Sequence, residues 1–172
     1  MEDTYVNHFG EKPRHVTSPL EKGDHPECDT SEFLGEREIK IYQSMIGSAQ
    51  WIIQLGRFDI AVHVMSLSSF RAAPRRGHLD RAKRLYGYVT KMKEAAIRYR
   101  TEMPDVSDLK FVEEDWSQSP YAGSKEDIPQ NIPRALGKSV ILLTYGDANL
   151  CHDLLSGKAV TGLLHFINKT PF

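Results

Sequence analysis

Four short stretches in the middle of the chain decide its fold: Tyr42–Trp51 (YQSMIGSAQW), Gly56–Ile60 (GRFDI), Ser66–Phe70 (SLSSF) and Gly77–Tyr88 (GHLDRAKRLYGY). In and around them, apolar residues recur at steps of three and four positions, which is the spacing of one face of an α-helix. The pattern predicts three short amphipathic helices. The last two carry many cationic residues.

The first predicted helix begins near Glu36 and stops near Gly56, because glycine favours a helix C-terminus. Gly47 inside it weakens the helix but allows another backbone to come close. Asp59 is placed to cap the second helix, and the third helix runs to about Lys91. The apolar faces are expected to form one core: Ile39, Tyr42, Met45, Ile46, Ala49, Ile52 and Ile53, then Ile60, Val64, Leu67 and Phe70, then Leu79, Ala82, Tyr86 and Val89.

The flanking segments have no sustained helical period. Residues 1–35 contain scattered prolines and glycines, which predict an irregular arm. Residues 36–100 form the helical region, within which 96–100 alternate and predict a short strand. Residues 101–137 are acidic and rich in proline, so we expect a linker between two domains there.

The last segment, residues 138–172, predicts a β-hairpin. Residues 138–145 are apolar and β-branched enough for a buried strand, and 159–168 predict a second strand. Asp153 and Gly157 are expected in the turn between them. The fold class is therefore α+β: a small helical unit, an acidic linker and a hairpin that forms an incomplete sheet. A hairpin alone is marginal in water.

The charge of the chain is strongly asymmetric. The formal net charge is −1, yet residues 57–100 hold eleven lysines or arginines and three acids. Such a basic block indicates a surface for phosphate groups or, equally, a solvated helix face. The candidate phosphate contacts are the cations of the third helix and its start: Arg75, Arg76, Arg81, Arg84 and Lys91.

Composition excludes several classes of protein. The 172 residues are 40% hydrophobic and 26% charged, a globular mixture without an apolar run of membrane-spanning length. The polar N-terminus shows no secretory signal, so we expect an intracellular protein in the cytoplasm or nucleus. The two cysteines, Cys28 and Cys151, have no partner at metal-binding spacing.

Asp147 is the sharpest candidate for chemistry. It is expected at the end of an apolar strand, where a carboxylate can project from a sheet and contribute an oxygen ligand to a hard cation. An aspartate at such a place can equally well end a strand or stabilise a turn.

The order of motifs resembles the polyproteins of copia-type retrotransposons. The stretches Tyr42–Ser48, Arg57–Ile60 and Leu67–Phe70, followed by Pro74, His78, Arg84 and Tyr88, resemble the end of the reverse transcriptase palm and its thumb and connection. Phe58 departs from a proline that is frequent in the family. Tyr145–Leu150 (YGDANL) and Val160–Gly162 (VTG) resemble the first two strands of the ribonuclease H domain.

The resemblance implies a parent enzyme that copies RNA into DNA and degrades the RNA strand with magnesium. Asp147 matches the first metal ligand of ribonuclease H, and the cationic helix matches a part that grips the RNA or DNA template–primer duplex. The chain has no Asp-Asp pair for polymerase chemistry and lacks the later ribonuclease H carboxylates. We therefore expect neither activity, and no bound metal, for this chain by itself.

The expected partners are a nucleic-acid duplex and the remaining parts of the polyprotein, with no membrane. Two other functions remain open. The helical region could be a stand-alone nucleic-acid-binding module, which predicts salt-sensitive binding. The chain could also be a protein-interaction fragment that pairs through the edge of its hairpin.

Overall fold

The structure is a computed structural model that describes residues 1–95, 97–110, 112, 115–124, 129–134, 136–149 and 153–172. The chain divides into two compact units. The first comprises Met1–Arg98 and Tyr145–Leu163, and the second comprises Tyr99–Thr144 and Leu164–Phe172. The α-helices all lie in the first unit, and the strands of the hairpin divide between the two.

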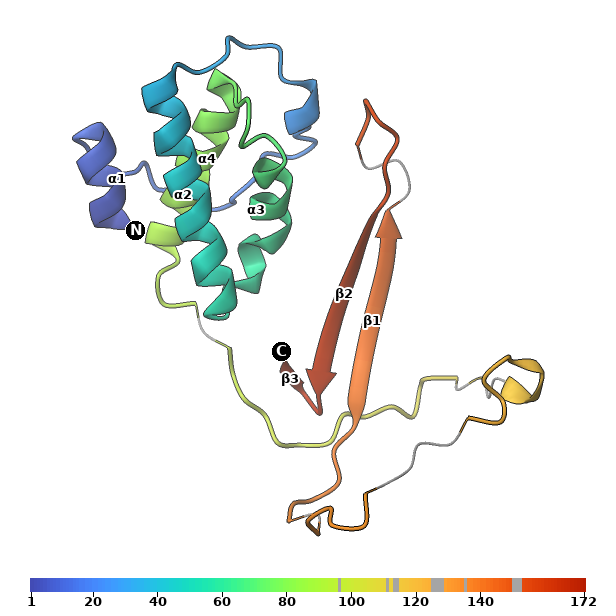
Figure 1. The fold of residues 1–172 in the computed structure, drawn as a ribbon. Helices are drawn as coiled ribbons and strands as arrows, with labels where there is room; N and C mark the ends of the chain where they lie inside the picture. The colour runs from blue at the N-terminus through green and yellow to red at the C-terminus, as the bar shows by residue number, and fades with distance from the viewer. Residues whose placement is uncertain (96, 111, 113–114, 125–128, 135, 150–152) are drawn as a thin grey trace. The chain divides into compact units, whose positions relative to one another are not determined.

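Four α-helices occur within the described ranges: α1 (Glu2–Phe9), α2 (Glu36–Gln54), α3 (Ala61–Ser68) and α4 (Arg76–Lys91) (Figure 1). Short 3₁₀ helices cover Pro26–Cys28, Phe58–Ile60 and Trp116–Gln118. Together with a small sheet, these elements confirm the predicted α+β class. No helix in the part of the chain that the structure describes is both long and apolar enough to cross a bilayer.

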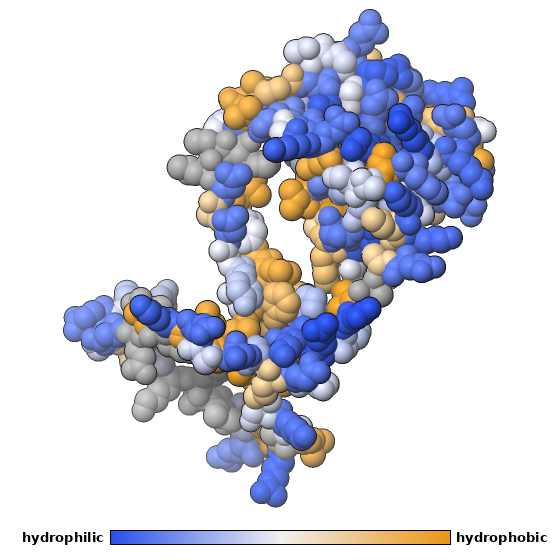
Figure 2. All heavy atoms as spheres, turned by 180° about the vertical axis from the view of Figure 1, so that it is seen from behind, coloured by the Kyte–Doolittle hydropathy of each residue, from blue (hydrophilic) through white to orange (hydrophobic). Residues whose placement is uncertain are grey.

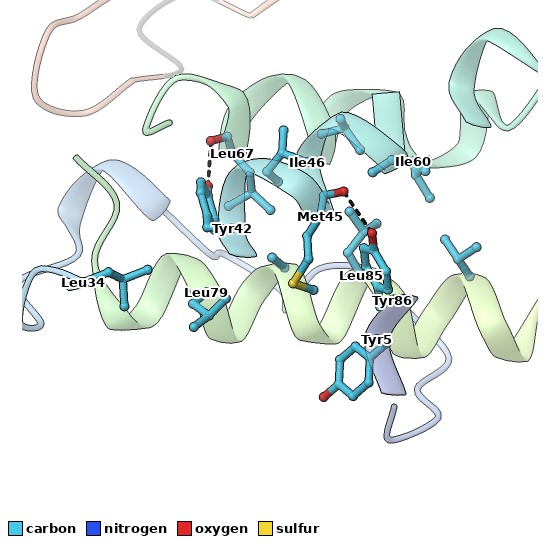
Figure 3. Packing of buried hydrophobic residues seen from close by; sticks show 14 residues of the cluster. Tyr5, Leu34, Tyr42, Met45, Ile46, Ile60, Leu67, Leu79, Leu85 and Tyr86 are labelled. Atoms are coloured by element: carbon cyan, nitrogen blue, oxygen red, sulfur yellow. Dashed lines mark hydrogen bonds between the residues drawn. The ribbon is translucent and has the colours of Figure 1, made fainter. Parts of the chain in front are cut away.

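The core lies where the helical period predicts it, between α2, α3 and α4 (Figure 3). Tyr42, Met45 and Ile46 of α2 have no exposed surface. The two buried tyrosine hydroxyls are satisfied by backbone carbonyls: Tyr42 donates to Leu67 at 2.7 Å, and Tyr86 donates to Met45 at 3.1 Å. Each phenol can therefore be buried without leaving a polar atom unpaired.

The first 35 residues are more ordered than their prolines predict. Glu2–Phe9 is helical, so the prediction of an irregular arm is wrong for this stretch. α1 forms because it buries Tyr5, which is 4% exposed and lies with its ring centroid 6.0 Å from that of Tyr86. We use "the arm" below for residues 10–35, which continue along α4.

Two glycines of α4 let the arm approach the helix closely. A Cβ atom at Gly87 would lie 2.0 Å from the carbonyl oxygen of Arg14, and one at Gly77 would lie 1.8 Å from the carboxylate of Asp29. Both distances are far below van der Waals contact. Gly47, which could allow such an approach, is exposed and would have nothing within 4 Å of an added Cβ.

The predicted cap at Asp59 is also wrong. α3 begins after Ile60 without a side-chain cap. The Asp59 carboxylate instead accepts two hydrogen bonds from the guanidinium of Arg57, at 2.9 and 2.8 Å, and one from the hydroxyl of Tyr88 at 3.0 Å. A guanidinium two residues away outcompetes the neutral amides, because hydrogen bonds between charged groups are stronger.

The sheet contains β1 (Leu142–Asn149), β2 (Val160–Ile167) and β3 (Thr170–Pro171) in that order. β2 and β3 are antiparallel and pair Phe166 with Pro171 and Ile167 with Thr170. Between β1 and β2, the carboxylate of Asp153 accepts hydrogen bonds from the amides of Leu155 and Ser156, and Gly157 takes φ 67°. The predicted turn residues are therefore confirmed.

β1 begins later than the sequence predicts, because Asn168 fixes its start. The Asn168 amide donates to the Ile141 carbonyl at 2.8 Å, and the Asn168 side chain accepts from the Ile141 amide at 2.9 Å. The prediction of a buried strand is wrong, since Val140 is 59% exposed and Leu142 is 63% exposed. Figure 2 shows hydrophobic residues, in orange, at the surface of the hairpin.

The short strand predicted at 96–100 is not formed over residues 97–100, and Ala96 lies outside the described residues. The amide of Arg100 donates instead to the Thr170 hydroxyl at 2.6 Å. A side chain thus takes the hydrogen bond that a neighbouring strand would provide.

Candidate nucleic-acid interface

The N-terminus of α4 is fixed by His78. The Arg75 amide donates to Nδ1 of His78 at 3.0 Å, and Nε2 of the same ring donates to the Pro26 carbonyl at 2.9 Å. The ring also stacks on Phe70 with a centroid separation of 4.1 Å. Burial lowers the pKa of His78, which suits a neutral ring with one donor and one acceptor. His78 therefore acts as a structural residue that joins the arm to α4.

Arg75 and Arg76, the first two predicted phosphate contacts, both bind within the chain. Arg75 donates to the Ser31 carbonyl, and its guanidinium lies over the Phe33 ring at 3.9 Å from the centroid. Arg76 forms a two-point ion pair with Glu38 of α2, with 2.9 Å between Nη2 and Oε2. The Arg76 side chain is still 49% exposed.

Arg81 binds two carboxylates of the arm. Its Nε and Nη2 donate to Asp24 at 2.7 to 2.9 Å, and its Nη1 donates to Asp29 at 2.5 Å. These hydrogen bonds raise the pKa of Arg81 despite its partial burial. Arg81 thus uses three of its five N–H donors within the chain, and its side chain is only 22% exposed.

Asp29 is held ionised by the same cluster. Burial acts to raise its pKa, but hydrogen bonds from the Ser31 hydroxyl and from Arg81, with the Ser31 amide and the charge of Arg81, outweigh burial and lower the pKa to about 2. The carboxylate is therefore charged at neutral pH.

Arg84 and Lys91 complete the predicted set. Arg84 donates to Glu21 of the arm at 2.9 Å, and its side chain is 30% exposed. Lys91, at the end of α4, is exposed and makes no ion pair within the described part of the chain. Four of the five predicted cations thus bind groups of their own chain, and Lys91 remains open to solvent.

Sequence reasoning missed the acids that bind these arginines. Glu21, Asp24 and Asp29 lie 52 to 63 residues before their partners. No local spacing rule connects groups so far apart. The available signal was the charge asymmetry itself: a basic helix and an acidic arm in a chain of nearly zero net charge.

Asp147 lies inside β1 rather than at its end, and its side chain is exposed. Magnesium requires several oxygen ligands arranged around it. No group of three or more histidine, cysteine, aspartate or glutamate side chains with metal-binding geometry occurs among the residues that the structure describes. Cys151 and His152 lie outside them.

Comparison with curated proteins finds a match to the "putative transposon Ty5-1 protein YCL074W" of Saccharomyces cerevisiae, with 34% identity over 65 residues. The matched region covers 38% of this chain and 21% of that protein, so the chain spans about a fifth of the length of this relative. No family model matches the chain. No solved structure matches it either.

Proposed function

We propose that the chain derives from the polyprotein of a copia-type retrotransposon and corresponds to the end of the reverse transcriptase and the start of ribonuclease H. The observation that carries this proposal is the similarity to the Ty5-1 protein, which suggests a retrotransposon origin. The order of the motifs from Tyr42 to Gly162 supports the finer assignment.

The role proposed for the helical unit is to hold a template–primer duplex through α4, without carrying out polymerase or nuclease chemistry. Lys91 is open to solvent, and Arg76 and Arg84 keep exposed surface beside their carboxylate partners. A phosphate offers the same bidentate geometry as a carboxylate. The phosphates of a duplex could therefore replace the carboxylates of Glu38 and Glu21 as partners of Arg76 and Arg84. Binding of this kind would position nucleic acid without reading its sequence.

The test measures binding of the full chain to a labelled RNA–DNA duplex at several salt concentrations. Binding should weaken as salt rises, and Lys91→Gln should reduce the slope of log K against log salt by about 1. Lys40→Gln, an equal change of charge on the exposed side of α2, is the matched control. Failure to bind at low salt would contradict the proposed grip.

A second assay addresses catalysis. The purified chain with magnesium should neither extend a primer nor cut the RNA strand of a hybrid. The physical reason is that one carboxylate cannot clamp both the attacking and leaving oxygens of a phosphodiester. Metal-dependent activity that is lost in Asp147→Asn would overturn this part of the proposal.

The hairpin favours a second candidate function, a protein-interaction fragment. β1 is an edge strand, and apolar side chains on both strands are exposed. Exposed edges and apolar patches are surfaces on which proteins associate. Association that depends on protein concentration and persists without nucleic acid would favour this candidate.

A further inference from the structure

A small cavity of about 270 Å³ lies between α1, α2 and α4. It is smaller than the pockets of about 300 Å³ or more that hold drug-sized ligands, so it suits a compact group. Three cations line it, Arg37, Arg76 and Lys83, against the single acid Glu38. Its lining therefore has an excess of positive charge.

Glu38 is in direct contact with only one of these cations, although its charge also acts on Lys83. It binds Arg76 at two points, as described above. Lys83 places its ammonium 4.5 Å from the centroid of the Phe9 ring, which provides no negative charge. Within the described residues, neither Arg37 nor Lys83 forms an ion pair. Two positive charges at the cavity thus lack a contacting counter-charge.

His8 adds an unsatisfied polar atom to the same lining. Its Nε2 is buried and has no hydrogen-bond partner among the described groups. Buried polar atoms are nearly always paired, so an orphaned one points to a missing partner. His8 lines the cavity, but its Nε2 has under 1 Å² of accessible surface, so the groups available to a ligand there are the charges of Arg37 and Lys83.

We propose that this cavity binds a phosphoryl group. A phosphate monoester carries a charge of about −1.5 to −2 and three acceptor oxygens, which matches two cations that have no carboxylate in contact. Arg37 provides a planar fork of donors and Lys83 a compact charge. The proposal differs from the predicted contacts on the outer face of α4 and stands whether or not the chain grips a duplex.

The test is calorimetric titration of the full chain with inorganic phosphate, with sodium chloride at equal ionic strength as the reference. Arg37→Gln and Lys83→Gln should each weaken binding roughly tenfold or more, because each removes a charge-assisted hydrogen bond. Lys40→Gln removes one charge from the same helix outside the cavity and should leave binding within about twofold. Circular dichroism checks folding, and Arg37 is exposed near the start of α2, so its variant separates binding from stability.

Two sources of the phosphoryl group are separated by a short oligonucleotide with and without a 5′-phosphate. If the phosphorylated strand binds more tightly and Arg37→Gln abolishes the difference, the site binds the end of a strand. If only inorganic phosphate binds, the site takes the free ion. Lys91→Gln should lower the affinity of both strands alike and leave the difference between them unchanged, which keeps this result distinct from the duplex assay. The proposal would be overturned if titration with phosphate released no more heat than titration with chloride. It would also be overturned if Arg37→Gln and Lys40→Gln bound phosphate with equal affinity.

Discussion

His63 of α3 is buried, with neither ring nitrogen hydrogen-bonded within the described structure. Burial lowers its pKa to about 4, although the charge of Asp24 offsets part of that effect. Because the unfolded chain binds the proton first, His63 makes the protein less stable as pH falls from 6.5 towards 4. Between pH 7 and pH 5 we expect His63 to cost roughly 1–2 kcal/mol of unfolding free energy.

His63→Leu should remove this pH dependence, since leucine does not titrate and leaves no buried nitrogen unpaired. Urea unfolding at pH 7 and pH 5 measures the effect. His15→Gln, on the exposed part of the arm, is the control and should keep the wild-type slope. If the free energy of unfolding changed equally between pH 7 and pH 5 in wild type and His63→Leu, His63 would not be buried in its neutral form.

Asp29 gives a dependence of the same sign at lower pH. Its lowered pKa means that it stabilises the fold fully above pH 3.8 and progressively less as pH falls through 2. Asp29→Asn should therefore lower the free energy of unfolding by roughly 1–3 kcal/mol at pH 7, a difference that shrinks towards pH 2. Thermal unfolding across this range is the measurement. The exposed substitution Asp108→Asn should show no such difference.

At the scale of elements, two helical glycines should respond in opposite ways to alanine. Gly87→Ala forces a Cβ against the Arg14 carbonyl, so the arm must move and stability should fall by about 1–3 kcal/mol. Gly47→Ala fills open space in α2 and should raise stability by roughly 0.5–1 kcal/mol through helix propensity. Chemical denaturation of both variants tests the pair, and a stabilising Gly87→Ala would contradict the close packing of the arm.

The elements also show what sequence reasoning can reach. α2 and α4 were predicted within a residue or two at each end, because a periodic apolar face depends only on local spacing. Gly47 and Asp59 were misinterpreted because the sequence position of a glycine or an acid does not indicate which residues pack against it in the fold. Asp59 is bound by Arg57 and Tyr88, and the second of these lies 29 residues away. The acids that bind the arginines of the candidate interface were missed for the same reason, since the sequence shows both groups but not that they meet.

For the whole molecule, the exposed hairpin should control association between molecules. Leu142→Lys places a charge on the edge strand β1 at a side chain that is 63% exposed, and charges on edge strands oppose edge-to-edge pairing. We expect less concentration-dependent association by sedimentation velocity, with unchanged helical content. Leu155→Lys, in the turn and 73% exposed, is the matched control with little effect expected. Equal behaviour of both variants would indicate that the strands do not mediate association.

The packing of the arm against α4 also has a consequence for the order of folding during synthesis. Asp24 and Asp29 leave the ribosome 52 to 57 residues before Arg81, so their partner does not yet exist when they emerge. Contacts that span so much chain close slowly, because the loop entropy is lost before the contact forms. The arm is thus among the first segments made and, we expect, the last of the helical unit to settle. Until then the surface of α4 at Gly77 and Gly87, where the arm packs closely in the folded protein, is uncovered.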